Sequence, residues 1–386
     1  MDPKLELIIG ADLVPTESNY REFCEGRAED LCGQEIMQRL LEADFRIFNL
    51  ETPLVHTLCP IPKCGPNLSA PVCTIRGIRS LNPSLLTLAN NHILDQGQEG
   101  ILSTMETLQK YAIPFVGAGN SLQEASSPYI LQKEGISVGI YACAEHEFSI
   151  ASETSAGANP FDPLESYDHV SSLKKKCDYV IVLYHGGKEY YRYPSPNLQK
   201  YCRKFVEKGA DLVICQHSHC IGCMENYQQG ILVYGQGNFL FDHSEHECWQ
   251  TSILLEVTFQ GKGGKPQIQA IPIRKHQNTV RLAQGEDRLR ILHDFDQRSD
   301  EIKNPEVVQQ KYLEFSRNSL YQTLGRFQSV PGKWVLRFLR MFGRDGAEKW
   351  YWNHFLLRGQ YLQMRNAMEC EAWREMLICA LSNWKK

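Results

Sequence analysis

The sequence predicts an α/β protein in which short strands alternate with helices over roughly residues 1–260. Runs of β-branched and aliphatic residues recur there, with segments of helical length between them. Acidic, amide and imidazole side chains recur near the ends of these runs. The expected strands are Leu5–Gly10, Phe45–Phe48, Leu85–Ala89, Ser137–Ala142, Tyr179–Leu183, Leu212–Cys215, Ile231–Tyr234 and Ser252–Phe259.

Two helices between these strands have clear sequence boundaries. The segment Gln98–Tyr111 is bounded by glycine and proline, and Asn197–Lys208 is followed by Gly209. Glycine is common just past a helix end because it adopts left-handed backbone without a steric penalty. Two long loops are also expected, at 57–76 and 145–163. Loops of such length inside a compact domain are usually functional lids or disordered.

The character of the chain changes after about residue 285, where strand patterns give way to Leu, Arg, Gln, Glu and aromatic residues. We therefore predict an α/β domain over 1–285 and a helical C-terminal region over 286–386. Within that region, 333–352 interleaves basic residues with aromatic and aliphatic ones. This pattern fits either a helix on a membrane surface or a helix packed on the main domain with a solvated basic face, and the second interpretation is favoured.

Composition narrows the class of protein. The chain has 386 residues, of which 42% are hydrophobic and 22% charged, as in folded globular proteins. A net charge of −4 predicts no bulk attraction to nucleic acid. The N-terminus lacks the pattern of a secretory signal, and no apolar run reaches the roughly 18 residues of a membrane span. A cytoplasmic protein is expected, in which the 14 cysteines are mostly buried thiols rather than a disulfide framework.

Residue types that bind metal ions follow five of the predicted strands. The carboxyl ends of strands in α/β sheets form the crevice where ligands bind. Isolated histidines near strand ends are usually core or surface residues, and an Asn-Asn-His sequence can be a turn, but their shared placement favours a site. Three imidazoles, two carboxylates and one amide suit one or two divalent ions, with Mn, Zn or Fe preferred. The candidate ligands are Asp12, Glu51, Asn91, His185, His217 and His219.

Six segments together resemble the bacterial capsule-synthesis CapA family, which is associated with poly-γ-glutamate production. They are ADLVPTESNY (11–20), FNLETPL (48–54), LANNHILDQGQEG (88–100), LYHGGKEYYRYPSP (183–196), KGADLVICQHSHC (208–220) and VYGQGNFLFD (233–242). The family belongs to the calcineurin-like metallophosphoesterase superfamily. The resemblance covers roughly residues 5–260. It implies a four-layer αββα sandwich of two mixed sheets flanked by helices, with a metal site at the strand ends.

The resemblance also implies how the ligands divide between two ions. One ion would be held by Asp12, Glu51 and His219. The second would be held by Glu51, Asn91, His185 and His217, so that Glu51 bridges the two. The sequence departs from the superfamily at the first block, because Asp12 is followed by Leu-Val and not by the usual x-His. One ion therefore lacks a ligand, and glutamate replaces the usual bridging aspartate.

His92 is similar to the superfamily histidine that lies near the leaving group and not on the metal. It would protonate the departing oxygen or stabilise charge in the transition state. Asp95 follows three residues later and could hold the imidazole, or it could cap the helix that begins near Gly97.

Further side chains leave the same strand ends. Lys188, Glu189 and Arg192 follow His185 and could line a pocket for an anionic substrate, or they form a solvated loop. Asn238 ends a Gly-Gln-Gly-Asn sequence in which glycine would let the backbone approach a ligand. A carboxylate from 145–147 could add to the crevice. The pair at 220 and 223 has zinc-binding spacing but lacks a second such pair.

These observations predict a metal-dependent hydrolase or transferase that acts on a phosphoester or an amide-linked anionic polymer in capsule or exopolymer biosynthesis. The alternative is a non-catalytic polymer-binding or assembly factor with a degenerate metal site. A third hypothesis is a peripheral membrane protein that makes surface contact through its C-terminal helices.

Overall fold

The computed structural model describes residues 3–324, 334, 337–338, 364 and 368. The chain divides into two compact units, Met1–Tyr312 and Leu313–Lys386. The predicted boundary at 285 coincides with the start of helix α9 (Gly285–Glu301), and the first unit continues beyond it into α10 (Pro305–Leu324). Most of the basic segment 333–352 lies outside the described residues.

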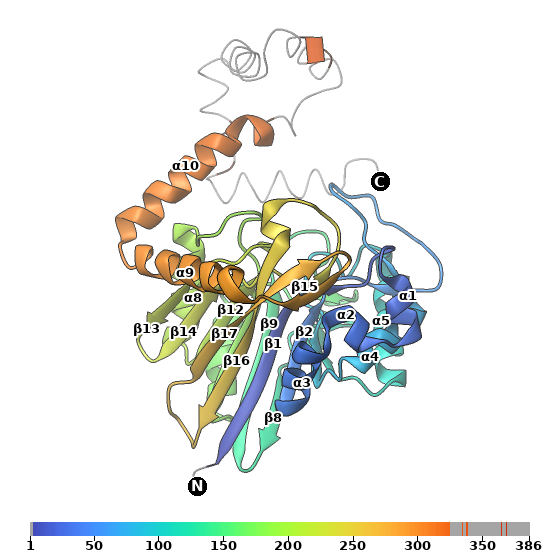
Figure 1. Cartoon of the computed structure of the whole chain (residues 1–386), viewed down its shortest axis with the longest axis horizontal. Helices are drawn as coiled ribbons and strands as arrows, with labels where there is room; N and C mark the ends of the chain where they lie inside the picture. Colours follow the sequence, from blue (N-terminus) through green and yellow to red (C-terminus); the bar gives the residue numbers. More distant parts are fainter. Residues whose placement is uncertain (1–2, 325–333, 335–336, 339–363, 365–367, 369–386) are drawn as a thin grey trace. The chain divides into compact units, whose positions relative to one another are not determined.

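Within the described residues, the first sheet has eight strands in the order β18-β17-β16-β1-β2-β5-β6, and β15 pairs with β1 (Figure 1). Strands β1, β2, β5, β6 and β15 run parallel where they pair, and β16, β17 and β18 extend the sheet antiparallel. The bounds are β1 Lys4–Val14, β2 Phe45–Leu50, β5 Leu85–Thr87, β6 Phe115–Val116, β15 Asn238–Phe241, β16 Thr251–Gln260, β17 Gln267–His276 and β18 Thr279–Leu282.

The second sheet has the order β13-β14-β12-β11-β9-β8 among the described strands. Its four central strands are parallel, and an antiparallel strand completes each edge. The bounds are β8 Tyr129–Lys133, β9 Ile136–Ala144, β11 Tyr179–His185, β12 Leu212–Gln216, β13 Met224–Tyr227 and β14 Gly230–Tyr234. Two short ribbons pair β3 (Leu54–Val55) with β4 (Ala70–Pro71) and β7 (Ala118–Gly119) with β10 (Gly157–Ala158).

Most helices lie on the outer faces of the two sheets, whereas α6 (Leu122–Ala125) packs against the ribbon of β7 and β10. Their bounds are α1 Tyr20–Glu25, α2 Ala28–Cys32, α3 Gln34–Glu42, α4 Ile75–Ser80, α5 Gly97–Lys110, α6 Leu122–Ala125, α7 Ser166–Lys174 and α8 Pro196–Glu207, with 3₁₀ turns at Val72–Thr74 and Glu247–Gln250. Helices α2 to α5 contribute to the core that includes the first sheet, whereas α7 and α8 pack on the second.

Alternation along β11 shows how the layers form. Successive side chains of a strand point to opposite faces of a sheet. Ile181 and Leu183 lie in the core between the sheets, while Val182 and Tyr184 lie in the core under α7 and α8. This arrangement of helix, sheet, sheet and helix confirms the predicted αββα sandwich. His185 continues the inward-facing series to the end of the strand.

All eight predicted strands and both predicted helices are present, but β1 is longer than expected. It runs to Val14 instead of Gly10, so Asp12 lies inside the strand and not after it. This end of β1 pairs with β2 on one side and, on the other, with β15 from more than 220 residues later, where the register shifts between Asp12 and Leu13. The pairing satisfies backbone groups that would otherwise be buried without partners.

The cysteines differ from expectation in one pair. Cys24 in α1 and Cys73 in the following 3₁₀ turn form a disulfide across a sequence separation of 49. Eight of the ten free thiols in the described part of the chain are buried, including Cys220 and Cys223, which lie in two different apolar clusters. None of the helices in that part combines the length and apolar character that a membrane crossing requires.

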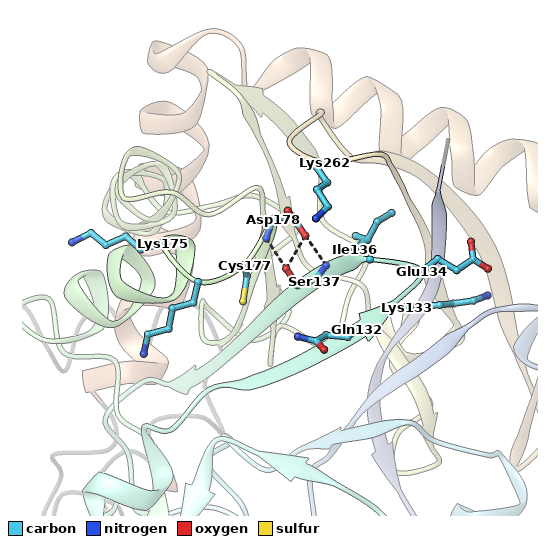
Figure 2. A pocket seen from close by; sticks show the side chains of 11 residues that line it. Gln132, Lys133, Glu134, Ile136, Ser137, Lys175, Cys177, Asp178 and Lys262 are labelled. Atoms are coloured by element: carbon cyan, nitrogen blue, oxygen red, sulfur yellow. Dashed lines mark hydrogen bonds between the residues drawn. The ribbon is translucent and has the colours of Figure 1, made fainter. Parts of the chain in front are cut away.

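A pocket of about 570 Å³ lies at the amino-terminal ends of β9 and β11 (Figure 2). Its rim carries several lysines, and Asp178 accepts hydrogen bonds from the backbone and hydroxyl of Ser137. Of the described residues that line it, none belongs to the predicted site. The predicted site lies at the opposite ends of the same strands.

Candidate metal centre

Six predicted ligands converge at the carboxyl ends of strands from both sheets. Asp12 comes from β1, Glu51 follows β2, and Asn91 follows β5 of the first sheet. His185 is the last residue of β11, and two histidines lie in the loop after β12 of the second sheet. Each of the six residues is at most 6% exposed. The ligands are therefore held in the seam between the sheets and not on a solvated rim.

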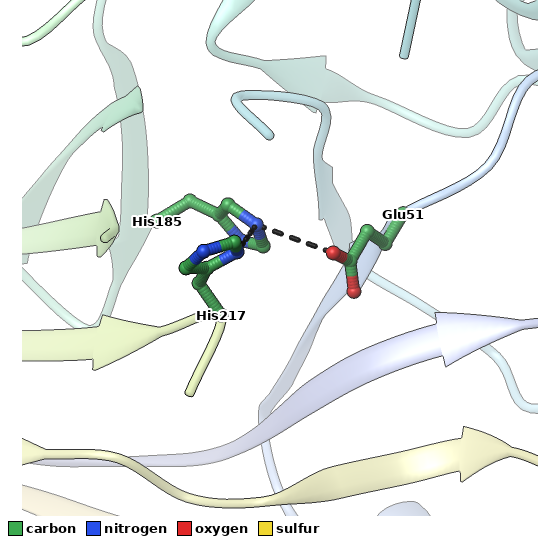
Figure 3. Close-up of side chains that lie close together, drawn as sticks. All are labelled: Glu51, His185 and His217. Atoms are coloured by element: carbon green, nitrogen blue, oxygen red, sulfur yellow. Dashed lines mark hydrogen bonds and ion pairs between the residues drawn. The ribbon is translucent and has the colours of Figure 1, made fainter. Parts of the chain in front are cut away.

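One group of ligand atoms surrounds His185 Nε2. This nitrogen lies 3.1 Å from His217 Nδ1 and 3.2 Å from Glu51 Oε1 (Figure 3). It also lies 3.0 Å from Asn91 Oδ1. An imidazole nitrogen carries either one proton or one lone pair, so it can serve only one of these neighbours through a hydrogen bond. Several electron-pair donors thus point toward one small space, as they do around a metal ion.

The second group contains Asp12, Glu51 and His219. Their ligand atoms all lie within 4.8 Å of one another, as do those of Glu51, His185 and His217. His219 Nδ1 is 3.4 Å from Asp12 Oδ2. Glu51 is common to both groups, so its carboxylate is placed between two clusters of donors.

Carboxylate oxygens that bind a cation are expected to lack hydrogen-bond partners in the protein. Both oxygens of Glu51 and Oδ2 of Asp12 are buried, with no hydrogen-bond partner among the described residues. The nearest imidazole nitrogens lie 3.2 Å from Glu51 and 3.4 Å from Asp12, and they form ion pairs with these carboxylates only when protonated. A buried carboxylate without compensation is costly, so it is normally paired or bound to metal. The arrangement fits a divalent ion.

Asn49 supports the ligands from behind. Its Nδ2 donates to Asp12 Oδ1 at 2.8 Å and lies 3.2 Å from His185 Nδ1. Its Oδ1 accepts from Thr87 and Asn90. These contacts leave Oδ2 of Asp12 and Nε2 of His185 facing the cluster. The sequence signal was the position of Asn49 two residues before Glu51, on the strand itself.

The loop that carries the last two histidines has a strained backbone. His217 has φ 84° and His219 has φ 52°, in the left-handed region that side chains rarely adopt. Such conformations cost about 1–3 kcal/mol each and cluster at functional sites. Gly235 permits the loop to approach, because a Cβ there would lie 2.7 Å from Ser218 Oγ. The glycine thus makes room for this loop, and its predicted role in admitting a ligand stays a prediction.

The histidines of the centre differ in the direction in which their surroundings shift the pKa. Burial lowers the pKa of His219, but the Asp12 and Glu51 carboxylates outweigh it and raise the value to about 9. Burial raises the pKa of Asp12, yet His219 and His185 together hold it below its usual value. Burial and the neighbouring His185 keep the pKa of His217 well below normal. His217 is therefore neutral near pH 7, the form that binds metal.

His92 lies beside this cluster and forms a pair with Asp95. Nδ1 of His92 is 2.5 Å from Oδ2 of Asp95, and the same oxygen accepts from the backbone N–H of Leu68 at 2.6 Å. The Asp95 carboxylate thus contacts the imidazole and the long loop 57–76, and not the first turn of α5. Because Asp95 occupies Nδ1, Nε2 is the ring nitrogen left for proton transfer.

Lys63 is a residue that sequence reasoning missed. It comes from the loop 57–76, its side chain is 2% exposed, and it forms an ion pair with Asp95 Oδ1. Its Nζ lies 3.2 Å from His92 Nδ1 and 5.8 Å from the centre of the Phe148 ring. Only the length of the loop signalled a function, because a single lysine among prolines has no local pattern.

The second long loop also reaches the site. Glu147 Oε2 accepts from Asn91 Nδ2 at 2.9 Å, and this turns Asn91 Oδ1 toward the ligand group. The carboxylate suggested for 145–147 thus lies behind a ligand. Both loops, 57–76 and 145–163, are therefore fixed to the site by polar contacts.

The residues predicted to bind substrate have different surroundings. Lys188 is exposed and Glu189 partly buried in the loop after β11, which a bond from Tyr190 N to Ser218 O ties to the histidine loop. Arg192 donates to Glu247 at 2.6 Å and to a backbone carbonyl, so its charge is already paired. Asn238 lies inside the centre, with Oδ1 2.9 Å from His219 Nδ1.

Comparison with known proteins shows a matching family model and similar sequences. A family model described as bacterial capsule synthesis protein PGA_cap matches residues 12–243, the stretch that contains every residue of the centre. Capsule biosynthesis protein CapA of Bacillus anthracis is 28% identical over 233 residues, 58% of this chain and 57% of that protein. PGA biosynthesis protein CapA of Bacillus subtilis (strain 168) is 28% identical over 209 residues, 53% and 54% of the two chains. The chain thus spans just over half the length of these relatives.

Among solved structures, the NAD nucleotidase of Haemophilus influenzae aligns with a TM-score of 0.45 and 13% identity, over 77% of this chain and 63% of that one.

Proposed function

Because the chain belongs to the PGA_cap family of bacterial capsule synthesis proteins, we propose that it is a metal-dependent hydrolase or transferase in the production of an anionic capsule polymer. Its substrate would be a phosphoester or the amide-linked polymer itself. The observation that carries the proposal is the placement of Glu51, whose two unpaired oxygens face two groups of buried ligands. A bound divalent ion would polarise the reacting bond and lower the pKa of an attacking water.

Other residues of the chain would transfer a proton, balance charge and bind the substrate. Asp95 holds Nδ1 of His92, which leaves Nε2 to deliver a proton to the departing oxygen or nitrogen. Lys63 balances the charge of Asp95 and anchors the loop 57–76 against the site. Lys188, exposed in the loop next to the histidines, offers positive charge to an anionic substrate. The buried setting of the ligands keeps bulk water away from the centre.

The test combines metal analysis with turnover. Purified full-length protein, stripped with a chelator and reloaded with Mn²⁺, is assayed on bis-p-nitrophenyl phosphate and on poly-γ-glutamate, with polymer length followed by gel. We expect hydrolysis of one substrate and a rate loss of about 10²–10⁴-fold in His92→Asn with unchanged metal content. His169→Asn, a partly buried imidazole on α7, is the matched control and should keep full activity.

A second candidate is a polymer-binding or assembly factor that holds metal without turnover. It is favoured by Val14, which stands where the superfamily has a metal-binding histidine and packs among Cys220, Phe241 and Trp249. That role predicts metal and poly-γ-glutamate binding with no hydrolysis by the wild type. Absence of both metal and turnover in the reloaded wild type would exclude the enzymatic proposal.

A further inference from the structure

The ligand group around His219 includes one oxygen that the expected ligand set lacks. Resting on the proposed metal centre, we propose that Asn238 is the fourth ligand of the ion held by Asp12, Glu51 and His219. The sequence suggested a substrate-binding role for Asn238. Val14 has no atom that can bind a metal ion, and the amide oxygen of Asn238 would take the coordination position that is left open.

The backbone places Asn238 directly beside Asp12. Asn238 is the first residue of β15, and in the parallel pairing of β15 with β1 its register partner is Asp12. Paired residues on adjacent strands present their side chains on the same face of a sheet. Gln236 anchors the approach to β15, because its Nε2 donates to the backbone carbonyls of Ile9 and Ile253. The position of Asn238 is therefore fixed by two neighbouring strands.

The side-chain contacts point to coordination. Asn238 Oδ1 lies 2.9 Å from His219 Nδ1, and Asp12 Oδ2 lies 3.4 Å from the same nitrogen. One imidazole nitrogen cannot satisfy two acceptor oxygens, but a cation among the three atoms could bind them all. Asn238 Nδ2 is buried and has no hydrogen-bond partner within the described residues. An asparagine kept only for hydrogen bonding would normally use this donor as well.

The opposite ligand group supplies an internal comparison. There Asn91 Oδ1 lies 3.0 Å from His185 Nε2, and Glu147 fixes the amide so that its oxygen faces the group. With Asn238 included, each group contains Glu51, one amide oxygen, at least one imidazole and four donors in total. Four nitrogen and oxygen donors suit Zn²⁺ or Mn²⁺ at either position.

A purely orienting role for Asn238 makes different predictions. In that case Oδ1 would accept a hydrogen bond from the N–H at His219 Nδ1, and His219 would bind the ion through Nε2. Loss of such an outer contact typically weakens metal binding by about 10–100-fold, so affinity by itself does not separate the two roles. The separation requires direct observation of which atoms touch the ion.

The experiment therefore counts ions and locates the ligand atoms. Full-length wild type and Asn238→Ala are stripped of metal, equilibrated with Mn²⁺ and analysed for bound metal. We expect two ions in the wild type, and in the variant one ion at unchanged affinity and a second weakened by about 100-fold or more. Asn238→Asp should restore the second ion. Asn19→Ala removes a buried amide that bonds Thr16 and Asn278 outside the centre, and it should still bind two.

A crystal structure of the Mn²⁺-loaded wild type completes the test. Coordination requires Asn238 Oδ1 and His219 Nδ1 at roughly 2.0–2.4 Å from the same ion. An ion bound through Nε2, with Oδ1 still hydrogen-bonded to Nδ1, would overturn this inference alone. Two tightly bound ions in Asn238→Ala would do the same. A wild type that binds no ion would overturn the inference together with the proposed function.

Discussion

Replacing Glu51 by glutamine should remove most of the stabilisation that divalent metal gives to this protein. Glu51 is shared by both ligand groups, and both of its oxygens face them without a hydrogen-bond partner in the described structure. An ion present at 1,000 times its dissociation constant stabilises the folded state by about 4 kcal/mol, so two ions contribute about 8 kcal/mol. A glutamine amide has one oxygen and no charge, and it can serve one ion weakly at best.

These free energies translate into a measurable melting shift. A unit of 312 residues unfolds with an entropy of about 0.7 kcal/mol/K, so about 8 kcal/mol corresponds to about 12 °C. We expect that rise in the wild type and less than about 3 °C in Glu51→Gln. Glu51→Gln also removes a buried charge that helps to raise the pKa of His219, so the rise of each protein is measured from its own metal-free melting temperature.

The assay is calorimetry of both proteins in chelator and in increasing Mn²⁺. Glu99→Gln, an exposed glutamate in the first turn of α5, is the control and should retain the full metal-dependent rise. If Glu51→Gln gained the same 12 °C as the wild type, Glu51 would not bridge the two groups and the reasoning from its unpaired oxygens would be refuted.

Three further predictions concern stability. In the metal-free protein, burial lowers the pKa of His219, but nearby carboxylates outweigh it and raise the pKa to about 9. This shift contributes up to about 3 kcal/mol to the free energy of unfolding below pH 6.5, and the contribution is lost as pH rises through 9. Urea unfolding at pH 6.5, 8 and 9.5 measures this loss. Lys63→Met leaves the buried charge of Asp95 without its ammonium partner and should cost about 3 kcal/mol, seen as a lower urea midpoint and faster proteolysis of the loop 57–76. Reduction of the Cys24–Cys73 disulfide should cost about 4 kcal/mol for its separation of 49 residues, and Cys24→Ser should unfold at the same urea concentration with or without reductant.

Each of these three predictions would be contradicted by one specific result. Stability that is flat between pH 6.5 and 9.5 would show that His219 does not hold a proton in the metal-free fold. Unchanged proteolysis in Lys63→Met would mean that the lysine does not anchor its loop. A wild type insensitive to reductant would show that the disulfide is absent in solution.

The strands could be predicted because their apolar runs are local, but their ends could not. Every residue from Leu7 to Val14 is buried, so the sequence contains no alternation that marks where β1 stops. Its length depends on pairing with β2 and with β15, and β15 comes from a distant part of the chain. The Cys24–Cys73 pairing likewise depends on the packing of two segments that no local pattern connects.

The sequence could predict those residues of the candidate site that lie at the end of a single strand. His185 is the last residue of a hydrophobic strand and Glu51 directly follows one, and their residue types suggest metal binding. The roles of Lys63 and Asn238 depend on contacts across the fold, with Asp95 in one case and His219 in the other. The partner of Arg192 also depends on a distant contact, because its guanidinium pairs with Glu247, and its predicted role in substrate binding stays a prediction.

The origin of the ligands in two different sheets has a consequence for folding. Asp12 and Glu51 belong to the first sheet, the histidines belong to the second, and the chain returns to the first sheet only at β15. During synthesis, a chain that ends before residue 212 carries the carboxylates but lacks the last two histidines, so it should bind metal weakly. In the proposed centre a bound ion would join both sheets, so amide hydrogens in β2 and β11 should then exchange through one shared opening event. Removal of the ion should let the two sheets open separately.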